Sequence, residues 1–269
     1  MADLHVQRDQ PPGVPPLQLT GERTLPDVPA ENYWYRRHLA VYEWIGARVI
    51  GKRVIDMASG EGYGAEVLAR GAGSVLGVEA NPEAFEHARA KYTAANVGFE
   101  RNMVELWTGD VDCVVFLQTI EHVPDPDGLL DHIRDLIGPG GVAYVSTPNV
   151  LTLAPKGAER SGNPWHVREY RPEDYRALCE RHFSRVDLLG LYHARRLRAH
   201  ELALRLGWDR IHAALRITKP FYDRFTPAIT ARDFALRPPK PGLCASRNGR
   251  HRPSPDLDRA LDLVAILSP

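Results

Sequence analysis

The 269-residue chain has few cysteines, and their spacing excludes two kinds of stabilised fold. Only Cys113, Cys179 and Cys244 occur, and no two of them form a Cys-x-x-Cys pair. Such a set provides neither the framework of a small disulfide-rich domain nor the thiolate ligands of a structural zinc site. Stability must therefore come from an apolar core, for which 43% hydrophobic residues are ample.

The chain also lacks an excess of either charge and a long apolar run. Its 34 Lys and Arg residues balance 34 Asp and Glu residues, so no overall field attracts nucleic acid or an anionic membrane. The apolar run Cys113–Leu117 is far too short to cross a bilayer. The first residues contain no apolar segment of a secretory signal. We therefore expect a cytoplasmic soluble protein without a nucleic-acid or membrane partner.

Proline, in contrast, is abundant and gathers at two places. Six of the 22 prolines fall within residues 1–30, and seven lie between Pro220 and Pro255. The segment 1–30 is polar and Pro-rich, which predicts a flexible N-terminal arm before a single domain over residues 31–269.

Short apolar segments alternate with segments of helical period between residues 50 and 193. The expected strands are 53–59, 74–80, 97–102, 112–118, 142–147 and 186–192, and the expected helices include 82–92, with Asn81 as its cap, 127–137 and 172–181. This alternation predicts an α/β fold with a doubly wound, mostly parallel sheet and helices on both faces. The late apolar run 261–267 is expected to close the sheet, whereas residues 194–255 do not continue the alternation and are rich in basic residues.

A glycine-rich turn follows the first expected strand. Gly60, Gly62 and Gly64 let the backbone turn sharply and let a ligand approach main-chain N–H groups. A side chain at Gly62 is expected to occupy space that the ligand needs. Glu79 ends the second strand, 19 residues after Gly60, where a carboxylate can accept both hydroxyl protons of a ribose. Together these features predict a site for a nucleoside cofactor.

The kind of cofactor depends on Asp56, four residues before Gly60. Because Gly60-x-Gly62-x-x-Ala65 also satisfies the dinucleotide fingerprint, a nicotinamide-dependent oxidoreductase is the alternative. A pyrophosphate prefers a helix N-terminus without a nearby carboxylate. A sulfonium cofactor carries positive charge, so Asp56 favours S-adenosylmethionine (SAM).

The same turn and the segments after it resemble the class I SAM-dependent methyltransferases. The resemblance covers residues 53–149 and includes the segments 118–124, 136–141 and 146–149. It implies a Rossmann-like fold, and it implies that SAM contacts Asp56, Ala58, Ser59, Gly60, Gly62, Tyr63, Gly64, Glu79, Ala80, Asn102, Met103 and Gln118. Asn102 stands where the family usually has an acid. A SAM-binding regulatory protein without turnover is a further alternative.

Candidate catalytic groups follow the fourth and fifth expected strands. Glu121 and His122 come after one strand, and His166 and Glu169 come after the other, so all four belong to the same edge of the sheet. The chain lacks the Asn/Asp-Pro-Pro-Tyr sequence of amine methylases, so oxygen is the expected acceptor. A hydroxyl acceptor must lose its proton to a base or to a metal-bound state. We predict His122 or His166, with Glu121, as the catalytic groups.

A metal is the alternative to a direct base. Ubiquinone-pathway O-methyltransferases resemble this segment, with Glu-x-x-Glu-His as a magnesium site, which implies Mg²⁺ on Glu121 and His122. His166, on the same edge of the sheet, is the further candidate ligand. Gln118 replaces the first acid of that pattern and lowers the charge of such a site. The direct base is therefore the preferred interpretation.

Segments outside the core resemble mycobacterial methyltransferases linked to the methylated glucose or mannose polysaccharides of actinobacteria. These segments are 19–24, 31–38, 146–149, 163–169 and 261–266. The resemblance implies a sugar or oligosaccharide acceptor, with a non-sugar natural product or quinone-type phenol as the alternative. From the strand and helix pattern we expect the methyltransferase domain to consist of a SAM-binding core over 50–193, an insertion over 194–255 that caps the acceptor, and a closing strand over 261–267. A lid is expected from Glu22, Arg23, Tyr33, Arg37 and His38.

Overall fold

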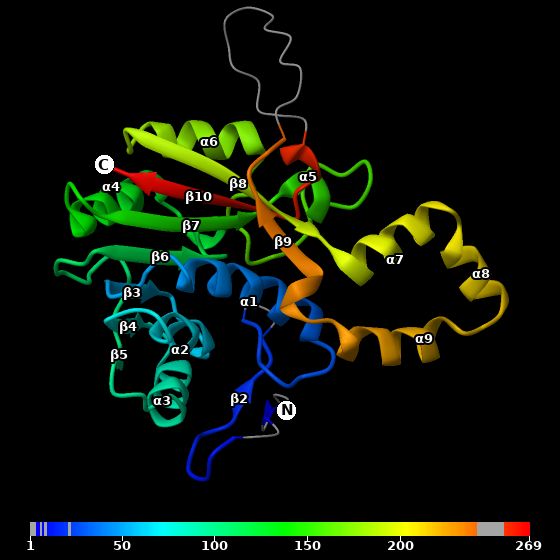
Figure 1. Ribbon diagram of the computed structural model, residues 1–269, viewed down its shortest axis with the longest axis horizontal. Coiled ribbons are helices and arrows are strands. Elements are labelled where there is room, and N and C mark those ends of the chain that lie inside the picture. The colour runs from blue at the N-terminus through cyan, green and yellow to red at the C-terminus, as the bar shows by residue number, and fades with distance from the viewer. Residues whose placement is uncertain (1–3, 6, 8–9, 21–22, 241–255) are drawn as a thin grey trace, which may run out of the picture.

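An eight-stranded sheet with helices on both faces organises the chain (Figure 1). The computed structural model describes residues 4–5, 7, 10–20, 23–240 and 256–269. The sheet strands, in chain order, are β3 (Arg53–Met57), β4 (Ser74–Val78), β5 (Val97–Glu100), β6 (Cys113–Leu117), β7 (Val142–Pro148), β8 (Arg185–His193), β9 (Phe234–Arg237) and β10 (Asp262–Ser268). The helices are α1 (Asn32–Gly46), α2 (Tyr63–Ala69), α3 (Pro82–Lys91), α4 (Pro126–Ile137), α5 (Val150–Leu153), α6 (Pro172–Glu180), α7 (Arg195–Arg205), α8 (Trp208–Ala214) and α9 (Thr218–Phe225).

The strand order, β5-β4-β3-β6-β7-β10-β8-β9, confirms the predicted doubly wound sheet. Strands β3 to β7 pair in parallel, whereas β10 runs antiparallel between β7 and β8. The chain winds outward from β3 to β5, then crosses to β6 and winds the other way. The carboxyl ends of β3 and β6 therefore flank a switch point, which is where open α/β sheets bind ligands.

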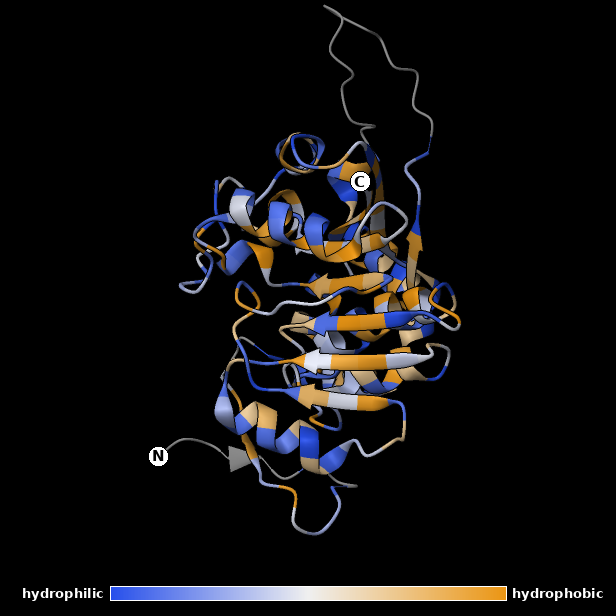
Figure 2. Ribbon diagram, turned by 90° about the vertical axis from the view of Figure 1, so that its left-hand side faces the viewer, coloured by the Kyte–Doolittle hydropathy of each residue, from blue (hydrophilic) through white to orange (hydrophobic). Residues whose placement is uncertain are grey.

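Alternating residues of the central strands pack on opposite faces of the sheet. Val54 packs in a cluster with α1 and α2, while Ile55 and Met57 pack in a second cluster with α4 and α6. Figure 2 shows the resulting pattern, in which hydrophobic strands lie between helices of mixed hydropathy. Because both faces are covered, the strands read as nearly continuous apolar runs in the sequence.

Local capping signals set two helix starts. The Asn81 side chain accepts a hydrogen bond from the N–H of Ala84 at 2.9 Å, and Pro82 occupies the first helical position, which confirms the predicted cap of α3. Asp125 does the same for α4 by accepting from the N–H of Gly128 at 3.0 Å. Each cap fixes the residue at which a helix begins after the carboxyl end of a strand, β4 for α3 and β6 for α4.

The described residues of segment 1–30 pack against the domain. A two-residue strand β1 (Leu4–His5) pairs with β2 (Leu17–Gln18), and Leu17, Leu25 and Val28 are buried in a cluster with Ala84 of α3. The prediction of a flexible arm did not anticipate these contacts, because apolar residues separated by prolines show no helical or strand period.

The region after β8 holds three short helices and a further strand. Helices α7, α8 and α9 project from the edge of the sheet, and the chain then returns as β9, which pairs antiparallel with β8 (Figure 1). No strand was predicted here, since the four residues of β9 are too few to show an alternation. The rest of the predicted insertion, residues 241–255 with Cys244, lies outside the described residues. Within the described parts of the chain, no helix is both long and apolar enough for a membrane span.

Candidate active site

The glycine-rich turn joins β3 to α2 through backbone that favours glycine. Gly60 has φ 57° and Gly62 has φ 98°, and Ala58 adopts φ 56° although it carries a Cβ. A Cβ built on Gly60 meets no atom within 4 Å, so this position faces open space. A Cβ on Gly62 lies 2.8 Å from the Cβ of Ala88 and would clash with α3. The expectation that a side chain at Gly62 enters the ligand space is therefore wrong, because that position faces the protein interior.

A small cavity of about 80 Å³ lies over this turn, at the switch point between β3 and β6. Its lining comes from both strand ends and from the N-terminal region, and comprises Arg23, Thr24, His38, Tyr42, Ala58, Ser59, Gly60, Glu61, Tyr63, Leu117, Gln118 and Thr119. Five of the predicted SAM contacts thus share one cavity. Gln118 is held there by hydrogen bonds from its N–H and its Nε2 to Ser146 Oγ, at 3.1 and 2.9 Å.

Asp56 lies at the end of β3 and is completely buried. Tyr42 donates a hydrogen bond to Oδ1 at 3.1 Å, while Oδ2 has no partner among the described residues. Burial raises the pKa of this carboxyl to about 7. An incompletely paired buried carboxyl favours a cation nearby, because the charge of the cation offsets the loss of hydration.

The predicted ribose acid already binds the turn. The two oxygens of Glu79 accept the N–H groups of Gly60 and Asn81, each at 2.8 Å. A pair of ribose hydroxyls would have to share or replace these bonds. Glu79 therefore both orients the glycine turn and presents a carboxylate at the edge of the sheet.

The remaining predicted cofactor contacts lie apart from the small cavity. Ala80 is exposed after β4, and Met103 is 49% exposed after β5. Asn102 donates from Nδ2 to Glu100 at 3.0 Å and accepts the N–H of Met103 at 2.9 Å. Gly64 faces α1, since a Cβ there would overlap the ring of Tyr42.

A buried network around Glu61 was not predicted. The Glu61 carboxylate pairs with Lys91 and His87 of α3 and accepts hydrogen bonds from Gln7 at 2.9 Å and from Tyr92 at 2.7 Å. Glu61 occupies a variable position of the glycine turn, so the motif gives no signal for it. The four-residue spacing of His87 and Lys91, which places both on one side of a helix, was the available clue.

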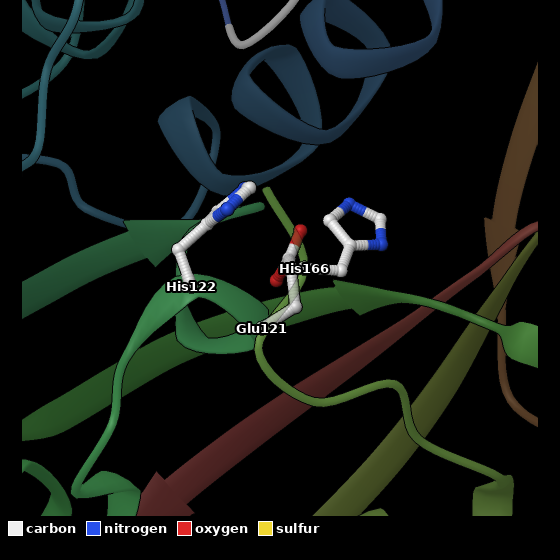
Figure 3. Close-up of side chains that lie close together, drawn as sticks. All are labelled: Glu121, His122 and His166. Atoms are coloured by element: carbon white, nitrogen blue, oxygen red, sulfur yellow. The ribbon is translucent and has the colours of Figure 1, made fainter. Parts of the chain in front are cut away.

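Glu121, His122 and His166 come together as predicted, beside the switch point (Figure 3). One donor atom from each lies within 4.8 Å of the others, and the rings of the two histidines are 5.1 Å apart. Glu121 and His122 belong to a 3₁₀ turn after β6, and His166 belongs to the loop after β7. Glu121 is 2% exposed, its Oε2 has no partner among the described residues, and burial raises its pKa to about 8.

Hydrogen bonds distinguish the two histidines. His122 Nδ1 lies 2.8 Å from the carbonyl of Trp165, so Nδ1 donates and the neutral ring carries its lone pair on Nε2. Both nitrogens of His166 are engaged, since Nδ1 contacts Glu169 at 2.7 Å and Nε2 contacts Asn163 Nδ2 at 3.0 Å. The Asn163 amide only donates through nitrogen, so Nε2 of His166 accepts and its Nδ1–H points at Glu169.

A second cavity, of about 480 Å³, contains this cluster. Its lining comprises Arg23, Thr24, Glu31, Trp34, His38, Gln118, Glu121, His122, Pro148, Leu153, Ser161, Gly162, Asn163 and His166. Arg23, Thr24, His38 and Gln118 line both cavities, so the two spaces are neighbours. One is bounded by the glycine turn and the other by the histidine cluster.

The predicted lid is only partly formed from the expected residues. Arg23 and His38 line both cavities, and Glu22 lies outside the described residues. Tyr33 instead contacts His193 at 2.8 Å, toward α7. Arg37 forms a buried ion pair with Asp262 of β10, with Nε 2.7 Å from Oδ2. These two side chains are drawn away by partners that lie far along the sequence.

Comparison with known proteins decides the family. A model described as a methyltransferase domain matches residues 33–202. The chain belongs to this methyltransferase family. It is 36% identical over 259 residues to a probable S-adenosylmethionine-dependent methyltransferase of Mycolicibacterium smegmatis, with 93% of this chain and 94% of the relative covered. A counterpart in Mycobacterium tuberculosis is 34% identical over 276 residues, with 97% and 95% covered.

More distant similarities agree on the fold. A ubiquinone biosynthesis O-methyltransferase of Pseudomonas aeruginosa is 31% identical over 128 residues, which cover 43% of this chain and 55% of the relative. The structure of a SAM-dependent methyltransferase from Thermotoga maritima superposes with a TM-score of 0.56 at 13% identity, covering 89% of this chain and 93% of that one. The Rossmann-like fold is thus confirmed, and the methyltransferase depends on SAM rather than on a nicotinamide cofactor.

Proposed function

We propose that this methyltransferase transfers a methyl group from SAM to a hydroxyl group of a small or oligomeric acceptor, with a sugar as the favoured class. The observation that carries this proposal is the histidine–glutamate cluster in a cavity beside the glycine turn. The two cavities share lining residues, so a donor over the turn and an acceptor in the larger cavity would be neighbours. Holding two reactants in line can supply effective molarities of about 10⁵–10⁸ M.

The smaller cavity is proposed to hold the methionine end of SAM. Bound SAM supplies an electrophilic methyl group on a positively charged sulfur. The buried carboxyl of Asp56 is hydrogen-bonded to Tyr42, which lines this space, and favours positive charge, while Gly60 leaves its backbone open to the ligand. Glu79 is proposed to bind the ribose, and Asn102 and Met103 at the next strand end are proposed to contact the adenine.

His122 is proposed as the base. Its Nδ1–H is fixed by the Trp165 carbonyl, so Nε2 can accept the proton of the acceptor hydroxyl as the oxygen takes the methyl group. His166 holds Glu169 and Asn163 with its two ring nitrogens and is proposed to position the cluster. Since its pKa is raised to about 8, Glu121 is protonated at neutral pH and can donate a hydrogen bond to the acceptor.

A divalent ion is the second possible means of activating the acceptor. It would be held by Glu121, His122 and His166, and it would lower the pKa of the acceptor hydroxyl. The unpartnered Oε2 of Glu121 fits a ligand role. Two imidazoles and one carboxylate suit a transition metal better than Mg²⁺, which prefers oxygen ligands. The bond between His166 and Asn163 would also have to break, so the direct base is favoured.

The lining of the larger cavity supports a sugar acceptor. Trp34 is 38% exposed and offers a flat face for a sugar ring, while Ser161, Asn163 and Glu31 offer polar atoms for hydroxyl groups. A phenol is the second candidate, supported by the ubiquinone biosynthesis O-methyltransferase relative and by the apolar lining from Trp34, Leu153 and Pro148.

The test is a methyl-transfer assay with SAM and two acceptor panels, gluco- and manno-oligosaccharides in one and catechols in the other. Product mass locates the methyl group, and release of S-adenosylhomocysteine gives the rate. Single-turnover rates with and without chelator are then compared for the parent chain, His122→Ala, His166→Ala and Glu121→Gln.

We expect a sugar to be methylated on oxygen, with a rate that chelator does not change and that falls at least about a hundredfold in His122→Ala. Loss of turnover on chelation, restored by added metal, would overturn the direct base in favour of the ion. Normal rates in both histidine variants would remove the cluster from the mechanism. Methylation confined to catechols would replace the sugar by a phenol, and SAM binding without transfer to any acceptor would favour a regulatory protein.

A further inference from the structure

Helices α7, α8 and α9, together called the arm, expose apolar residues that the domain does not cover. Of residues 195–228, only Leu197 and His212 are buried. Twelve large hydrophobic residues are exposed among the described residues, and five of them fall within residues 202–217, namely Leu202, Leu206, Ile211, Leu215 and Ile217. Such a concentration on a projecting element indicates a surface that is covered by something else (Figure 1).

The apolar residues of α7 lie on two sides of the helix. Leu197 is buried, and Leu204 lines a cavity of about 230 Å³ between the arm and α1. Leu202 and Leu206, which are 59% and 79% exposed, are four residues apart and share the opposite side. A surface helix normally has a polar outer side, so this exposed pair is not explained by packing within the domain.

Basic residues accompany the exposed leucines. Arg195, Arg198 and Arg205 are spaced at three, four or seven residues from Leu202, which puts them on the same side of α7. Residues 194–224 contain eight basic and three acidic side chains. Two of the acids are paired within the arm, as Glu201–Arg205 and Asp223–Lys219, whereas no ion pair of the described residues involves Arg198, Arg210 or Arg216.

We propose that the arm docks on an anionic lipid surface. Leucine and isoleucine side chains enter the boundary between headgroups and acyl chains, and arginines place their apolar stems beside them while the guanidinium groups meet lipid phosphates. Nucleic acid would match the charge but gives the exposed leucines no role. A second copy in a two-fold contact would set arginine stripes against each other, which like-charge repulsion opposes.

This inference revises the expectation of a protein without a membrane partner. That expectation followed from balanced total charge, which hides a local excess in the arm. The docking proposal depends neither on the identity of the acceptor nor on the histidine cluster. The arm and the larger cavity are connected through α1, which contributes Trp34 to that cavity and Tyr33 to the cavity beneath the arm.

The test is sedimentation of the full chain with vesicles of phosphatidylcholine alone or mixed with phosphatidylglycerol. We expect binding only to the mixed vesicles and weaker binding as salt is raised. Leu202→Ser with Leu206→Ser should weaken binding at least about tenfold, and Arg198→Gln with Arg210→Gln should weaken it about fivefold for each arginine. The matched control, Ile50→Ser with Arg70→Gln, changes exposed residues far from the arm and should bind like the parent.

Unchanged SAM affinity and circular dichroism in each variant establish that the fold is intact. Absence of binding to phosphatidylglycerol vesicles would overturn the proposal, and so would equal loss in the control variant. Duplex DNA or RNA binding that depends on the arginines but not on the leucines would replace it by a nucleic-acid surface. A concentration-dependent dimer that the leucine variant abolishes would replace it by self-association.

Discussion

Two glycines of the cofactor turn should respond differently to the same change, one mainly in SAM binding and the other mainly in stability. Both have a backbone in the left-handed region, so alanine at either costs about 1–2 kcal/mol of folding free energy. At Gly62 the new Cβ also lies 2.8 Å from Ala88 Cβ and 2.9 Å from Tyr92 Cδ2. Such overpacking adds about 1–3 kcal/mol. Gly62→Ala should therefore lose about 2–5 kcal/mol in total, and Gly60→Ala only about 1–2 kcal/mol.

Urea unfolding and titration calorimetry with SAM separate the two effects. Gly60→Ala should lower the midpoint only by the smaller backbone cost and bind SAM at least about fivefold more weakly, because its Cβ projects into open space beside the small cavity and loss of even one backbone contact costs about 1 kcal/mol or more. Gly62→Ala should have the clearly lower midpoint. If Gly62→Ala unfolded like the parent and lost only SAM affinity, our assignment of this glycine to packing against α3 would be refuted.

Three further changes test charges at the site. Glu79→Ala should bind SAM at least about tenfold more weakly and unfold at lower urea, since each charge-assisted bond contributes about 1.5–3 kcal/mol; an unaltered dissociation constant would contradict its role. Because the pKa of Asp56 is raised to about 7, the stability it contributes is present below about pH 4 and lost as the pH rises through 7. Two other groups titrate nearby and are unchanged in Asp56→Asn: Glu121, with its pKa raised to about 8, adds a loss up to that pH, and His38, with its pKa lowered to about 4, adds a gain below about pH 6.5. The parent should therefore show an additional loss of unfolding free energy between about pH 4 and 7 that comes from Asp56. Asp56→Asn should flatten that loss, and an equal slope in both would refute the assignment. Arg37→Ala leaves Asp262 buried and unpaired and should cost about 3–5 kcal/mol by urea unfolding, and a loss below about 1 kcal/mol would show that the pair is solvated.

Features with a local physical cause were predictable from the sequence. The cap at Asn81, the turn through Gly60 and the buried strands each depend on neighbouring residues, so their pattern is visible without the fold. The meeting of Glu121, His122 and His166 followed from topology alone, because parallel strands put their carboxyl ends on one edge of the sheet.

Features that depend on distant partners were not predictable. Arg37 is a charged residue on a helix, which is typical of a lid. It points inward only because it pairs with Asp262 of β10, which lies 225 residues later in the sequence. The role of Gly62 depends on how closely α3 approaches the turn. The exposure of Leu202 and Leu206 could not be predicted either, since a helical period shows which residues share a side of the helix but not whether the domain covers that side.

The antiparallel strand β10 has a consequence for how the protein is made. It is hydrogen-bonded along both edges, to β7 and to β8, yet it is the last strand of the sheet to leave the ribosome. Until it arrives, both neighbours expose open edges that can pair with other chains. During synthesis these two edges therefore stay without their partner strand for as long as the ribosome takes to translate the arm and the residues after it.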